Sequence, residues 1–203
     1  NAEDLATGEG LTLLAGTGNI TVTGSVGEKN PLGSLIITSA KDVSFTGNIS
    51  AASFTQIAGT GTTTFEGIQN YSGDFLFTGE NLTVNNAFNA GGYARITNQG
   101  LFTKNSTGVV TVTGTFIQDG DGLNSLGANI TTTDNNINFS TGITLLEDVQ
   151  LSTGVGAGNI TLTSTVNAED LATGEGLTLL AGTGDITVTG LVGATNPLGS
   201  LTI

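Results

Sequence analysis

Four strand-like segments follow one another at nearly equal distances: SLIITSA (34–40), SFTQIAG (53–59), DFLFTGE (74–80) and ARITNQG (94–100). The spacing places four apolar residues in register at steps of 20, 20 and 19 residues: Ile37, Ile57, Phe77 and Ile96. A second series has steps of 20, 19 and 18: Phe45, Phe65, Val84 and Phe102. Two series with one period predict at least two short strands in each unit of about 20 residues, a pattern typical of a parallel β-solenoid.

Glycine, asparagine and aspartate separate the strand-like segments, as in AGTG (15–18), NAGG (89–92) and TDNN (133–136). These residues accept positive φ angles at sharp corners. The 20-residue register favours pairing of each strand with its equivalent one coil later. We therefore expect an all-β chain, a parallel β-helix of about 20 residues per coil, with the nine phenylalanines in core stacks.

A longer repeat lies above this short one, because residues 167–203 copy residues 1–37 with five differences. The differences are Asn19/Asp185, Ser25/Leu191, Glu28/Ala194, Lys29/Thr195 and Ile36/Thr202. In a strand the side chains alternate between two faces, and none of the five falls on the predicted core side. We interpret residues 1–166 as one full repeat of about eight coils and residues 167–203 as the start of the next.

Composition limits the partners and the chemistry. A net charge of −13 repels phosphate backbones and anionic membranes, so nucleic acid is not an expected partner. The chain has no Cys, His, Met or Trp, and no apolar run approaches the roughly 18 residues of a membrane span. One arginine, Arg95, lacks an acidic cluster in the sequence around it, and Glu147 and Asp148 are expected on opposite faces of a strand. We therefore do not expect an enzyme.

One segment resembles the start of a calcium loop. Asp119, Asp121 and Asn124 supply alternate oxygen ligands around glycine turns, which suits a hard cation. A structural turn is the competing interpretation, because the downstream glutamate of an EF-hand is missing. Calcium is the only cofactor that the sequence suggests. Residues 119–128 and 27–34, with the copy at 193–200, break the register and are expected to project as loops.

Outward threonines recur in T-x-T motifs, such as Thr21 with Thr23 and Thr111 with Thr113. Flat threonine arrays can bind ice, but threonine is also a favoured exposed β-residue, and no long regular array is evident. Sequons such as Asn48-Ile-Ser50 and Asn81-Leu-Thr83 arise wherever asparagine ends a turn and a hydroxyl residue faces out of the next strand.

Two stretches resemble the repeats of large bacterial surface proteins of the filamentous haemagglutinin and autotransporter-like adhesin class. They are GLTLLAGTGNITVTGSVG (10–27) and AGNITLTSTVNAEDLATGEGLTLLAGTGDITVTG (157–190). The resemblance covers most of the chain. It implies a right-handed parallel β-helix, export to the cell surface, and a role as stalk, fibre or adhesin.

We therefore expect the structural shaft of an extracellular or cell-surface filament, in which further copies of the repeat stack in the same chain or end to end. The alternative is an adhesin that binds glycans or neighbouring cells through loops projecting from the solenoid.

Overall fold

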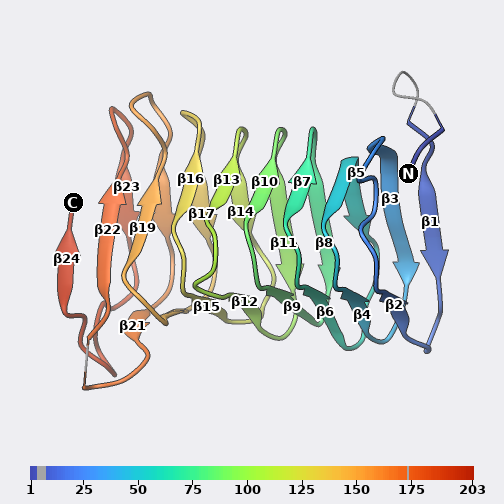
Figure 1. Ribbon diagram of the computed structural model, residues 1–203. Coiled ribbons are helices and arrows are strands. Elements are labelled where there is room, and N and C mark those ends of the chain that lie inside the picture. Colours follow the sequence, from blue (N-terminus) through green and yellow to red (C-terminus); the bar gives the residue numbers. More distant parts are fainter. Residues whose placement is uncertain (4–7, 173) are drawn as a thin grey trace.

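The chain folds into a β-solenoid of about 9 turns with roughly 21 residues per turn, as the computed structural model shows (Figure 1). The structure describes residues 1–3, 8–172 and 174–203. The described residues form 24 strands and no helix, and the strands of successive coils pair in parallel. The all-β, parallel β-helix prediction is confirmed.

Each coil contributes strands to three faces, which we call A, B and C. Face A contains β1 (Leu11–Leu14), the C-terminal parts of β3 (Leu32–Ser39) and β5 (Ile49–Gln56), then β8 (Phe75–Gly79), β11 (Ala94–Asn98), β14 (Phe116–Gln118), β17 (Ile137–Phe139), β20 (Ile160–Leu162) and β23 (Ile186–Val188).

Face B is a separate eight-stranded sheet of β2 (Ile20–Val22), β4 (Val43–Phe45), β6 (Thr62–Phe65), β9 (Asn81–Val84), β12 (Phe102–Lys104), β15 (Asn124–Leu126), β18 (Ile143–Leu145) and β21 (Val166–Ala168). Face C begins with the N-terminal parts of β3 and β5 and continues through β7 (Gln69–Tyr71), β10 (Phe88–Ala90), β13 (Val110–Val112), β16 (Ile130–Thr132), β19 (Val149–Ser152), β22 (Gly176–Leu180) and β24 (Ser200–Thr202). Faces A and C belong to one sixteen-stranded sheet, because β5 pairs with both β7 and β8.

The core runs along the inside of the coils. Side chains alternate between core and surface, so most three-residue strands are buried at their first and third positions. All nine phenylalanines are buried, which confirms the predicted core stacks: Phe45, Phe54, Phe65, Phe75, Phe77, Phe88, Phe102, Phe116 and Phe139. The rings of Phe54 and Phe75 stack with centroids 4.9 Å apart, and those of Phe45 and Phe65 with centroids 5.5 Å apart.

One member of each predicted series is wrong. Ile37 pairs with Gln56, which in turn pairs with Phe77, so Gln56 takes the core position and Ile57 lies in the corner, 55% exposed. In the second series Val84 pairs with Lys104, whereas Phe102 pairs with Leu82. Gln56 and Lys104 are polar residues in apolar columns, so the periodicity of apolar residues does not identify them as core positions.

Asparagines at the corners join successive coils through their side chains. Asn48 Oδ1 accepts the backbone N–H of Ile68, and Asn81 Oδ1 accepts that of Leu101, each at 2.8 Å. Asn129 repeats the contact with Gln150 at 2.7 Å. The bonds replace strand pairing where the chain turns, so Asn48 and Asn81, which begin the two sequons named above, have a structural role.

Segment 119–128 does not project as a loop, contrary to the sequence-based expectation. It contains β15, and Gly120, Gly122, Gly127 and Ala128 within it are buried. A Cβ atom on Gly122 would lie 1.5 Å from the carbonyl oxygen of Gly100, so only glycine lets these coils approach so closely. The other predicted loop is shorter than expected, because β3 already begins at Leu32 and leaves residues 27–31 outside strands.

Candidate functional site

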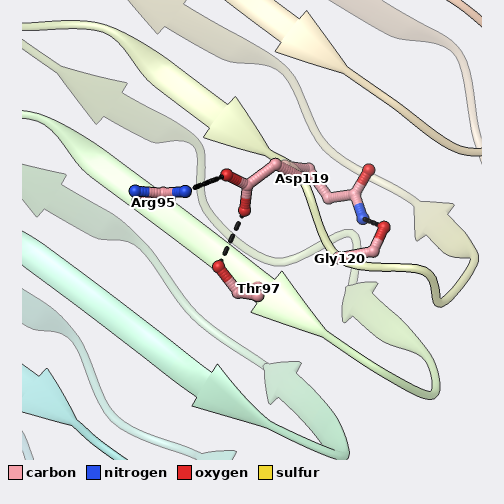
Figure 2. A network of polar contacts seen from close by, with 5 residues as sticks. Arg95, Thr97, Asp119 and Gly120 are labelled. Atoms are coloured by element: carbon pink, nitrogen blue, oxygen red, sulfur yellow. Dashed lines mark hydrogen bonds and ion pairs between the residues drawn. The ribbon is translucent and has the colours of Figure 1, made fainter.

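A charged network on face A joins two neighbouring coils (Figure 2). Arg95 lies in β11, and Asp119 directly follows β14, the next strand on the same face. Arg95 Nε donates to Asp119 Oδ2 at 2.7 Å, and a second guanidinium nitrogen lies 2.5 Å from the same oxygen. Thr97 Oγ1 donates to the other carboxylate oxygen, Oδ1, at 2.7 Å. Both oxygens of Asp119 are therefore engaged.

The network shifts the pKa of both charged groups. Partial burial of Asp119 acts to raise the pKa of its carboxyl, but the hydrogen bonds from Arg95 and Thr97 and the charge of Arg95 outweigh burial and lower it. The hydrogen bond to Asp119 raises the pKa of Arg95. Asp119 is therefore held as a carboxylate by a partner that the sequence spacing did not reveal.

A shallow hollow of about 440 Å³ adjoins the network on face A. It is lined by hydroxyl, apolar and charged side chains: Thr55, Gln56, Ile57, Leu76, Phe77, Thr78, Arg95 and Thr97. Cross-strand register explains the gathering, since Thr55, Leu76 and Arg95 are successive outward neighbours on β5, β8 and β11. Hydroxyls beside a guanidinium can make hydrogen bonds to a polar ligand.

The three residues of the predicted calcium loop have different environments. Asp119 pairs with Arg95, Asp121 is exposed, and Asn124 is buried. Asn124 Nδ2 donates to Thr141 Oγ1 at 3.0 Å and to the carbonyl of Gly142 at 3.2 Å. Among the described residues no group of three or more acidic side chains is arranged to hold a metal ion. Calcium binding by these residues stays a prediction.

A column of buried amides lies on the inner side of the corner between faces A and B, and the sequence interpretation missed it. Gln118 Nε2 donates to Asn98 Oδ1 at 2.8 Å, and Gln118 Oε1 accepts from Thr141 and Asn124. Two coils before Asn98, Thr63 Oγ1 donates to Gln56 Oε1 at 2.8 Å. The 20-residue spacing of Asn98 and Gln118 is the signal that could have predicted it.

Lys104 is fully buried among apolar side chains of the core. Its Nζ donates to the carbonyls of Asn105 and Thr107 at 2.7 and 2.8 Å, so the head group is satisfied at the corner that follows β12. Burial lowers the pKa of Lys104 to about 8.

A row of serine and threonine side chains runs along the outside of face B. The separated T-x-T motifs did not suggest this row. Register aligns Thr21, Ser44, Thr64, Thr83, Thr103, Ser125 and Thr144 on seven successive strands. The row is one residue wide and ends at Asn167 of β21. It is a regular array, but threonine and serine are also ordinary exposed residues of strands.

Carboxylates gather where the first repeat meets the second. A surface hollow of about 430 Å³ is lined by Leu146, Glu147, Asp148, Glu169, Asp170, Gly174 and Glu175. Glu147 and Asp148 lie in the turn between β18 and β19 and are both exposed, so the expectation that they occupy opposite faces of a strand is wrong. Asp148 Oδ1 accepts the N–H of Gly176 at 2.6 Å, which ties β22 to the preceding coil.

Comparison with family models, with curated proteins and with solved structures finds no match to this chain. The fold is that of a solenoid repeat protein, as the sequence periodicity predicts. None of the described residues forms a helix long and apolar enough to cross a membrane.

Proposed function

We propose that this chain is a segment of the structural shaft of an extracellular or cell-surface filament, built from 166-residue repeats stacked as one continuous solenoid. The observation that carries the proposal is β21, Val166–Ala168, because this strand contains the last residue of one repeat and the first two of the next. It pairs with β18 in unbroken register. Repeats joined within a strand form one rod rather than separate domains.

The physical properties of the rod suit a shaft. Parallel ladders run along all three faces, and each coil is stabilised mainly by contacts with its neighbours. Stability without cysteine suits an exported chain, and the negative charge favours solubility. The resemblance to bacterial surface proteins of the filamentous haemagglutinin class supports the same location and role.

Chains carrying one, two and three copies of residues 1–166, each closed by residues 1–37, would test the proposal. We expect rods that lengthen by roughly 37 Å per repeat, because each repeat makes nearly eight coils and each coil adds about 4.8 Å. Small-angle scattering and negative-stain electron microscopy measure this length. A string of separate globules, or a length that does not grow with repeat number, would contradict the proposal.

An adhesive role is the second candidate, favoured by the hydroxyl-lined hollow beside Arg95. A glycan bound there would lose hydrogen-bond partners in the variant Arg95→Ala with Thr78→Ala. The matched control, Thr161→Ala with Thr163→Ala, changes outward positions further along the same face. Binding to a glycan array that is lost only in the first variant would support adhesion through the hollow, and equal binding by both variants would contradict it.

A further inference from the structure

We propose that successive 166-residue repeats display the same surface on the three faces of the shaft in turn, each repeat displaced by one face from the repeat before it. The inference rests on the proposed function, since it concerns several repeats within one rod. It follows from the positions of the two copies that the structure contains, residues 1–37 and 167–203.

The two copies have the same local structure. Leu11 pairs with Leu35 in the first copy, as Leu177 pairs with Leu201 in the second. The corner bonds are also conserved between the copies, since Asn1 Oδ1 accepts the N–H of Lys29 at 2.8 Å and Asn167 Oδ1 accepts that of Thr195 at 2.9 Å. Each copy therefore folds into its own coil in the same way.

The copies nevertheless stack on different faces. Strand β1 belongs to the face A column that continues through β3 and β5, whereas its equivalent β22 pairs with β19 on face C. Strand β2 pairs with β4 on face B, but its equivalent β23 pairs with β20 on face A.

The bridge made by Val26 in the first copy is displaced in the same direction in the second copy. Val26 bridges to Ile49 on face C, and its equivalent Val192 bridges to Val166 on face B. All three contacts of the second copy lie one face before those of the first.

The displacement follows from the number of strands in a repeat. Face A carries β1, β3, β5, β8, β11, β14, β17 and β20 in succession, so seven coils separate β1 from β20. Strand β22 follows β20 after β21, two faces further on. The repeat thus spans seven coils and two thirds of another, slightly less than the eight coils expected from sequence.

The fold tolerates this displacement because the faces are interchangeable. All three consist of short parallel strands with alternate residues buried, and backbone pairing does not depend on which face receives the next strand. In the second copy the inner side chains of β23 meet Ile160 and Leu162 on face A. Leu177 and Leu179 pair with Val149 and Leu151 on face C.

Three repeats, 498 residues at 166 each, would return to the starting face after 23 coils, or roughly 110 Å at about 4.8 Å per coil. The loop at residues 27–31, in which Glu28, Lys29 and Pro31 are exposed, and its copies would then project in three directions around the shaft. A filament with this geometry would present such a loop to partners on every side.

Disulfide formation in the 203-residue chain tests the displacement directly, because the native chain has no cysteine. Thr161 and Thr187 are register neighbours on face A, and neighbouring strands about 4.8 Å apart bring Cα atoms within disulfide range. We expect Thr161→Cys with Thr187→Cys to form a disulfide under mild oxidation. The matched pair Asn167→Cys with Thr187→Cys should not, and the opposite result would overturn the proposal, because a repeat of eight whole coils would place β23 on β21.

The three-repeat chain extends the test to the array. A small folded tag inserted between Glu28 and Lys29 of each repeat should project in three directions in electron micrographs. Tags aligned along one side of a long rod would overturn the rotation while leaving the shaft proposal intact. Rods that fail to lengthen would contradict the shaft instead, and the disulfide pairs would still decide the rotation.

Discussion

Leu35 and Ile37 have Leu201 and Ile203 as their equivalents in the second of two nearly identical copies, yet the first pair is buried and the second is not. Leu35 and Ile37 are 0% exposed, whereas Leu201 and Ile203 are 49% and 74% exposed. Leu35 lies between β1 and β5, while Leu201 has a paired strand, β22, on one side in this structure. The difference shows that a coil of this fold is completed by its neighbours, so the burial of a residue depends on the coils stacked on it.

The largest expected effect is the difference between one mutation made in the two copies. Leu35→Ala should lower the free energy of unfolding by about 2–5 kcal/mol, because it leaves a cavity between two coils. Leu201→Ala should cost less than about 1 kcal/mol, as expected for a half-exposed side chain. Urea unfolding followed by circular dichroism measures both, and equal costs would show that the last coil is packed as tightly as the interior.

Covering the second copy should remove most of that difference. Extending the chain after Ile203 with a copy of residues 38–56 supplies a strand whose Phe54 equivalent would lie over Leu201, as Phe54 lies over Leu35. We then expect the cost of Leu201→Ala to rise into the range of about 2–5 kcal/mol. An extension of scrambled sequence is the control. An unchanged cost with the native extension would mean that the new coil does not stack.

A smaller effect tests, in the middle of the rod, how the burial of a residue depends on the coils on either side of it. Lys104 is covered by Val84 and Leu126 of the two neighbouring strands, and its burial lowers its pKa to about 8 from an ordinary value of 10.5. Between these two pH values the unfolded chain holds a proton that the folded chain has lost. The free energy of unfolding should therefore increase as the pH is raised from 8 to 10.5.

The variant Lys104→Met should lack that part of the pH dependence, whereas Lys41→Met, at an exposed position, should keep it. Urea titrations at several pH values would measure the slopes. If Lys104→Met retained the full rise between pH 8 and 10.5, the lysine would be solvated in the folded protein.

Much of the fold could be predicted from sequence because its period is short and its alternation regular. The pairs Phe45 with Phe65 and Phe77 with Ile96 were predicted in their observed register. The five differences between the copies were placed outside the core, and none of the ten residues concerned is buried. The prediction failed at Ile57, which is exposed while Gln56 takes the inward position, and at Phe102, which is buried but pairs with Leu82, so that Lys104 and not Phe102 is the partner of Val84.

The candidate site was predictable only in part. Asp119 was identified as a residue of interest, but its partner Arg95 lies 24 positions earlier. No local motif links the two, because the contact exists only when β11 and β14 become neighbours. The buried amides of Asn98, Gln118 and Asn124 depend on the same stacking.

The sequence by itself determined the solenoid, its coil length and the identity of the two copies, since these follow from the spacing of apolar residues and from direct comparison of residues 1–37 with 167–203. Only the tertiary structure decided which face each copy occupies and which polar groups enter the core. The physical reason is that parallel backbone pairing is much the same on all three faces. The face is therefore set by the accumulated lengths of every coil in between, and no single segment carries that information.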